Sequence, residues 1–257
     1  MSMLSNPAFL LSRLKAASIH LAISLAVATL AALLVFFVWY PYPYREISGG
    51  RELFSLVVVV DVIMGPLMTL AVFNLKKPRK ELRRDLTVIG LLQLAALVYG
   101  LWTVAIARPV YLVFEIDRFR VVHAVDVEPA LLKRATPDLQ HLPLMGPTLL
   151  SVRGFKDNKE SFDATMAALQ GLELGARPDF WQSYEKAKIQ IIAKAKSVAE
   201  LKIRFPARVI DIDAALAAAP ANTPVGYIPL HSRGVFWTVL INTNTAEVLG
   251  FVPLDPY

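Results

Sequence analysis

The sequence predicts a membrane protein with an α-helical anchor of three transmembrane helices, followed by a soluble α+β domain with antiparallel strands. The first observation is composition: 55% of the 257 residues are hydrophobic and the mean hydropathy is +0.48, which is too apolar for an ordinary soluble chain. The second is that three long apolar stretches fall within residues 1–108. The third is a change of pattern after residue 108, to short alternating runs and amphipathic segments.

Each apolar stretch is long enough to cross about 30 Å of hydrocarbon as a helix. The spans are expected at about 17–38, 55–73 and 86–106. The first ends in Phe36-Phe37-Val38-Trp39 rather than in a small-residue cleavage site, so it is interpreted as an uncleaved signal anchor. Tyr40, Tyr42 and Tyr44 follow among prolines, as an aromatic belt at the membrane surface does.

The loops between the spans predict the orientation of the chain. The loop Asn74–Asp85 carries six lysines and arginines, whereas in Pro41–Glu52 two arginines are balanced by two glutamates. Because basic loops stay in the cytoplasm, we expect the N-terminus and the second loop there. Three crossings then place residues 109–257 in the periplasm, and the protein in the inner membrane of a bacterium.

The expected outer domain, 109–257, begins where Arg108-Pro109 ends the third span. Val110–Ile116 and Phe119–Val125 resemble a β-hairpin, and Thr148–Arg153 a short strand. The apolar spacing predicts helices at Lys156–Gln170 and Phe180–Lys202, and Pro206 is a candidate first residue of another. Three strands are expected at the C-terminal end, at Tyr227–His231, Val235–Asn242 and Val248–Pro253.

Charge and composition exclude several classes of function. Residues 1–108 hold 11 Lys/Arg and 5 Asp/Glu, and residues 109–257 hold 16 of each, so the excess charge of +6 belongs to the anchor. A nucleic-acid-binding surface would need that charge on the soluble domain, so nucleic acid is not expected as a partner. The chain has no cysteine, which excludes disulfides and thiolate chemistry. No cofactor or metal motif is present.

Asp61 is the most unusual residue of the anchor. A carboxylate inside a span costs about 2.5–3.5 kcal/mol on insertion scales, and is by default a functional candidate with a partner to be found. Tyr99, at similar depth on the third span, is the first candidate partner. Gly65-Pro66 predicts a kink one turn away that frees the carbonyl of Val62, with Gln93 and Thr69 as candidate donors. Asp61 is favoured as a structural residue that locks the bundle over one that transfers protons.

No catalytic set is evident in the expected outer domain. It has no Gly-x-Ser-x-Gly elbow, no phosphate-binding loop and no His-Glu-x-x-His. Glu115 and Asp117 are expected on one face of a strand or turn, but Arg118 and Arg120 are close by, so salt bridging is favoured over acid–base chemistry. A histidine approaching both acids would be needed for an enzyme.

Several ordered segments resemble the TfpX/TfpZ family of type IV pilin accessory proteins. They include the stretches Arg13–Leu21, Trp39-Tyr40-Pro41, Asp61 with Gly65-Pro66-Leu67, Arg84-Asp85-Leu86, Gln93, Tyr99-Gly100 and Ala107–Phe119, with Gly146-Pro147 and Tyr227–Leu230 further on. The resemblance covers nearly the whole chain and is weakest at about Lys156–Pro220. It implies no catalytic residues.

The resemblance implies a non-enzymatic inner-membrane accessory protein that binds pilin and modulates the assembly or retraction of type IV pili. Pilins wait in the inner membrane with a hydrophobic helix in the bilayer and a globular head outside. A membrane-tethered periplasmic enzyme that acts on pilin or envelope substrates remains the alternative. The candidate residues for partner binding or for specifying the bundle are Asp61, Gly65, Pro66, Gln93, Tyr99, Arg108, Glu115 and Asp117.

Overall fold

A computed structural model describes residues 7–257, and the contacts within it divide the chain into two units, Met1–Ile106 and Ala107–Tyr257. The first unit contains three helices that are long and apolar enough to cross a membrane, Pro7–Trp39, Gly50–Val72 and Arg79–Ile106. The second is a mixed α+β unit built on an eight-stranded sheet. The predicted fold class is therefore confirmed.

The three long helices are made of several segments. Helix α1 (Pro7–Leu33) continues as a π-helix, Leu34–Trp39. The second long helix joins α3 (Gly50–Val58), the π-helical segment Val59–Met64 and α4 (Gly65–Val72). The third is α5 (Arg79–Ile106), and the short helix α2 (Tyr44–Ile47) lies between the first two. All three begin earlier than the hydropathy indicates, because a helix continues through polar residues such as Arg13 and Arg83 beyond the hydrocarbon.

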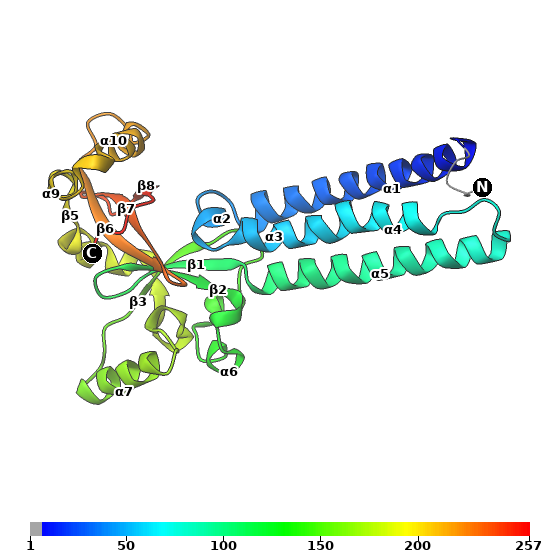
Figure 1. Ribbon diagram of the computed structural model, residues 1–257. Coiled ribbons are helices and arrows are strands. Elements are labelled where there is room, and N and C mark those ends of the chain that lie inside the picture. Colours follow the sequence, from blue (N-terminus) through cyan, green and yellow to red (C-terminus); the bar gives the residue numbers. More distant parts are fainter. Residues whose placement is uncertain (1–6) are drawn as a thin grey trace. The chain divides into compact units, whose positions relative to one another are not determined.

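The second long helix lies between the other two, and packs against both (Figure 1). At one end of the unit the three helices share a core, formed by Ala31, Val35, Tyr40, Phe54 and Val104. The hydroxyl of Tyr40 donates a hydrogen bond to the carbonyl of Val104 there, at 3.0 Å. This end therefore holds the first and third helices together, whereas along the rest of their length they are joined through the second.

The eight strands form one mixed sheet in the order β4-β3-β1-β2-β6-β7-β8, with β5 paired to β6. The strands are β1 (Pro109–Phe114), β2 (Phe119–His123), β3 (Thr148–Val152), β4 (Trp181–Ser183), β5 (Lys196–Ser197), β6 (Val225–Ser232), β7 (Val235–Asn242) and β8 (Val248–Val252). Most neighbours are antiparallel, as expected, but β1 pairs with β3 and β2 with β6 in parallel. Every residue of β1 is buried, as suits a central strand.

Helices cover the sheet in two groups around two cores. The helices of this unit are α6 (Pro129–Leu132), α7 (Asn158–Leu169), α8 (Lys188–Lys194), α9 (Val198–Arg204) and α10 (Val209–Ala217). Residues of α9 and α10, among them Leu201 and Ile212, pack on β6, β7 and β8. The other core, with Val113, Phe180 and Trp181, lies around β1 and β3.

One predicted helix, Phe180–Lys202, is wrong. The segment instead contains β4, a 3-10 helix, α8, β5 and the start of α9. Trp181 and Gln182 pair with β3, and Lys196 and Ser197 pair with β6, so strand pairing interrupts the helix near both of its ends. The predicted strands at the two ends of the domain, and the helices at α7 and α10, are confirmed.

Candidate functional site

Asp61 lies in the π-helical segment Val59–Met64, in the middle of the second long helix. The residue is 6% exposed, and neither oxygen of its carboxylate has a hydrogen-bond partner within residues 7–257. A buried, unsatisfied carboxylate is costly in a protein interior and more so at membrane depth. Asp61 is therefore the starting point for a candidate site in the helical unit.

Gln93 of α5 bonds to the main chain of Asp61 rather than to its carboxylate. Its Nε2 donates to the carbonyl oxygen of Asp61 at 3.2 Å. In a π-helix that carbonyl would pair with the N–H five residues on, which is the position of Pro66, and proline has no N–H. Gln93 therefore supplies the donor that Pro66 lacks. From the sequence, Gln93 was expected to donate to the carbonyl of Val62. Because this segment is a π-helix, the carbonyl that needs a donor is that of Asp61 instead.

Gly65 allows the approach of Gln93 to the second long helix. A Cβ atom on Gly65 would lie 1.8 Å from Nε2 of Gln93, so no other residue fits without moving the amide. Gly100 has a similar role on α5, since its Cβ would lie 2.7 Å from Cγ2 of Val57. Small residues at such contacts are how membrane helices come close together.

The other polar neighbours of Asp61 are engaged with each other. Nδ1 of His20 on α1 lies 2.5 Å from Oγ1 of Thr69 on α4, so Thr69 does not serve the carbonyl that the sequence suggested. Nearer the end of α4, Nε of Arg13 donates to the carbonyl of Leu70 at 2.6 Å. These polar contacts join α1 to α4, and none of them is a hydrogen bond to the Asp61 carboxylate.

Tyr99 does not hydrogen-bond to Asp61, although the depth argument made it the first candidate partner. Tyr99 is 67% exposed and its ring lies 5.9 Å from that of Trp102, although Tyr99 and Asp61 line one groove. Matching depth fixes only the height of a residue in the bundle, whereas the side on which it lies depends on helix rotation.

Two grooves on the helical unit meet at Asp61. One, of about 270 Å³, lies between α1 and α5 and is lined by His20, Ile23, Ser24, Val27, Asp61, Gly90, Gln93, Leu94 and Leu97. The other, of about 220 Å³, lies between the second long helix and α5, with Val57, Asp61, Tyr99 and Gly100 among its lining residues. The first groove is the more polar, because three polar side chains besides Asp61 line it.

Glu115 and Asp117 are held by different arginines in the α+β unit. Nε of Arg120 donates to Glu115 Oε1 at 2.7 Å, and the N–H of Gly175 donates to the same oxygen at 2.7 Å. Asp117 is half exposed and pairs with Arg118 at 2.9 Å. Both acids therefore take part in salt bridges, as favoured from the sequence.

Arg108 contacts the loop before β3. Its Nη2 donates to the carbonyl of Pro143 at 3.1 Å. This hydrogen bond links the start of the α+β unit to that loop.

A polar pocket that the sequence did not reveal has a volume of about 530 Å³. Arg120, Asp126, Glu173, His231 and Arg233 are among the residues that line it. Arg233 pairs with Asp126 at 3.0 Å, and Arg120 pairs with Glu173 at 3.0 Å. These residues come from β2, β6 and connections that are far apart in the chain, so no local sequence motif could have predicted the pocket.

The buried His123 lies beside this pocket's Asp126. Its Nδ1 is 2.9 Å from Asp126 Oδ2, while burial lowers the pKa of the imidazole. Burial alone would raise the pKa of Asp126, but the hydrogen bond from His123 and the charges of His123 and Arg233 lower it to about 2. For His231, burial and the charge of Arg120 lower the pKa. The carboxylate of Asp126 is therefore favoured in its ionised form, whereas burial favours the neutral imidazoles of His123 and His231.

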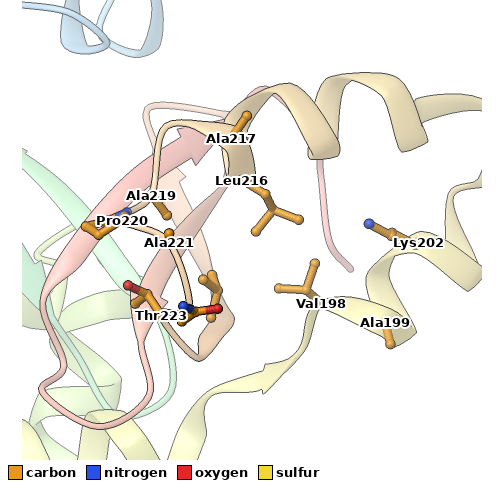
Figure 2. A pocket seen from close by; sticks show the side chains of 11 residues that line it. Val198, Ala199, Lys202, Leu216, Ala217, Ala219, Pro220, Ala221 and Thr223 are labelled. Carbon is orange, nitrogen blue, oxygen red and sulfur yellow. The ribbon is translucent and has the colours of Figure 1, made fainter.

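Another pocket, of about 810 Å³, is lined mainly by apolar side chains. It lies between α9, α10 and the loop that leads to β6, and most of its lining is alanine, valine, leucine and proline (Figure 2). Its one charged residue, Lys202, is paired with Asp213. Among residues 7–257, no group of three or more His, Asp or Glu side chains is arranged to hold a metal ion.

The fold and these sites define a class: a protein with three candidate membrane-spanning helices that pack together, and an α+β domain whose charged side chains are mostly paired with one another. Comparison with known proteins then gives the family. The chain belongs to the fimbrial assembly protein FimB family, whose profile matches residues 8–49.

Two of the relatives match along most of the chain. The sequence is 37% identical over 233 residues to the fimbrial assembly protein of serogroup I from Dichelobacter nodosus, covering 90% of this chain and 91% of that one. It is 36% identical, with the same coverage, to the protein of serogroup E1. The relative from serogroups C1 and C2 is 44% identical over 113 residues, 44% of this chain and 86% of its own. No solved structure matches.

Proposed function

We propose that this protein assists the assembly or retraction of type IV pili by binding the pilin in the inner membrane, without catalysis. The observation that carries the proposal is the 37% identity to a fimbrial assembly protein along 90% of the chain, which spans both the helical and the α+β units. Neither the family nor those relatives' names indicate a reaction. The finer resemblance to the TfpX/TfpZ accessory proteins gives the same assignment.

Within this proposal the two units have separate tasks. Residues 1–108 are the anchor that meets the hydrophobic helix of the pilin, and residues 109–257 form a periplasmic domain that meets its globular head. The basic loop Asn74–Asp85 supports a cytoplasmic N-terminus and a periplasmic C-terminus. The candidate contacts are Asp61 with its surroundings, and the surface near Arg108, Glu115 and Asp117.

Among residues 7–257, the acids that could support the alternative of a periplasmic enzyme are held in other contacts. Glu115 is engaged by Arg120 and Gly175, and Asp117 by Arg118, so the two acids do not form a catalytic pair. His123 is bonded to Asp126 instead. A binding role is therefore the better supported of the two.

Photocrosslinking in membranes tests the proposal. A photoreactive residue at Ile63 or Leu67, which are 50% and 53% exposed on the second long helix, should trap co-expressed pilin. The same residue at Val57, which is buried, is the matched control and should trap none. Capture of lipid alone at the exposed positions, and of no pilin from any position on the α+β unit, would contradict the proposal.

A further inference from the structure

The groove between α1 and α5 is lined partly by polar residues, and one of them, Asp61, has a carboxylate without a hydrogen-bond partner in the described part of the chain. His20 and Ser24 of α1, Gln93 of α5 and Asp61 of the second long helix are the polar residues that line it. This arrangement is unusual for a surface that faces lipid, where apolar side chains are expected.

The neighbours of Asp61 leave its carboxylate without a donor. The amide of Gln93 is bonded to the carbonyl of Asp61, and the His20 ring to the hydroxyl of Thr69. Both carboxylate oxygens are buried and unpartnered. Because an unsatisfied carboxylate in the bilayer is costly, a donor from outside the chain would stabilise this site.

The groove also has room for such a donor. Away from the end where Tyr40 bonds to Val104, the first and third helices pack on the second rather than on each other, which leaves about 270 Å³ open between them. Gly90 lines the groove, and a Cβ atom added to it would have no neighbour within 4 Å. Ile23 and Leu94 line it too, and are 59% and 56% exposed. An apolar helix could therefore lie along the groove with one polar group over Asp61.

We infer that this groove is the docking site for a transmembrane helix of a partner protein, and that Asp61 accepts a hydrogen bond from a donor group on that helix. The inference rests on the proposed function, under which the partner is the pilin. A helix is the fitting occupant because in lipid it satisfies its own backbone, so that only the group facing Asp61 needs a partner.

The test uses the full-length protein in membranes with co-expressed pilin, and photoreactive residues at Ile23 and Leu94. Capture of pilin is expected at both positions, but not at Leu92, which is 60% exposed on α5 and does not line the groove. Asp61→Ala should lower the capture about tenfold or more, since it removes a hydrogen bond to a charged or strongly polar group. Asp61→Asn, which keeps one acceptor oxygen, should lower it less.

Gly90→Leu is a second, independent variant. It fills the groove and leaves Asp61 and the contacts between the helices in place, so capture at Ile23 and Leu94 should be lost while thermal unfolding in detergent stays unchanged. This variant decides the question even if the Asp61 variants fold poorly.

The possible results show whether the inference fails alone or together with the proposed function. Equal capture in wild type, Asp61→Ala and Gly90→Leu would overturn the inference, as would capture only of lipid or of a second copy of this chain at the groove positions. If pilin is still trapped at Ile63 or Leu67 in those cases, the proposed function stands. Absence of pilin capture at every position would overturn both.

Discussion

At the scale of single residues, the charged side chains of the α+β unit differ sharply in how much they are expected to stabilise it. Glu115 and Arg120 form a pair in which both side chains are nearly buried, and Glu115 also accepts from the main chain of Gly175. Asp117 and Arg118, in the connection between β1 and β2, form an exposed pair. A buried pair that loses one partner leaves an uncompensated charge, whereas an exposed pair leaves a solvated one.

Glu115→Gln should therefore destabilise the protein by about 3 kcal/mol, because Arg120 loses its nearest carboxylate and retains only that of Glu173. The measurement is the thermal unfolding of the full chain in detergent micelles. Asp117→Asn is the control and should cost less than about 1 kcal/mol. Equal effects of the two substitutions would mean that the Glu115 pair is not buried as described.

His123 makes the stability of the protein depend on pH. Because burial lowers the pKa of its imidazole from 6.5, the unfolded chain binds a proton below that pH before the folded chain does. Stability should then decrease as the pH falls from 7.5 to 5.5, and His231 adds to the decrease with the same sign. Asp126 adds its own loss only between about pH 3.8 and about pH 2.

The check on this pH dependence is His123→Gln, whose amide does not titrate. The fall in unfolding temperature between pH 7.5 and 5.5 should be smaller in this variant than in the wild type, and smaller still in His123→Gln combined with His231→Gln. If His123→Gln leaves the pH dependence unchanged, the buried imidazole is not its source.

At the scale of the helices, Pro66 and Gln93 are expected to act as one unit. Gln93→Leu leaves the carbonyl of Asp61 without a donor, and an unpaired buried polar group costs about 1–3 kcal/mol. Pro66→Ala restores an N–H at the position that the π-helix pairs with Asp61. Gln93→Leu should therefore cost less in the Pro66→Ala background than in the wild type, as measured by a double-mutant cycle of thermal unfolding. Additive costs would exclude the proposed link between the two residues.

For the helices, the sequence predicted the spans but not the contacts of individual residues. Hydropathy predicted the three spans, because long apolar segments leave few alternatives in a membrane. It did not predict that the π-helix moves the unsatisfied carbonyl from Val62 to Asp61, since an α-helical register was assumed. Nor did it predict that Tyr99 leaves the Asp61 carboxylate unbonded, because the rotation of each helix is set by packing at residues such as Gly65 and Gly100.

The α+β unit shows the same division between local and distant information. Hairpin-forming strands such as β6 and β7 were predicted, because alternation and turn residues are local signals. The parallel pairing of β1 with β3 and the strand β4 depend on partners far along the chain. In α7, the apolar spacing of Phe162, Met166 and Leu169 predicted a helix correctly, yet all three are exposed and Ala164 is buried. Periodicity there indicates the type of element and not its buried face.

At the scale of the whole molecule, the charge distribution predicts a single orientation across the membrane. The six basic residues of the loop Asn74–Asp85 should hold that loop in the cytoplasm, so a phosphatase fused after Tyr257 should be active in the periplasm and one fused at Asn74 inactive. A fluorescent protein that folds only in the cytoplasm should give the opposite pattern. Replacing Lys76, Lys77, Arg79 and Lys80 by glutamine should weaken the orientation and mix the two patterns. An active phosphatase at Asn74 in the wild type would contradict the orientation, and with it the placement of the α+β unit beside a periplasmic pilin head.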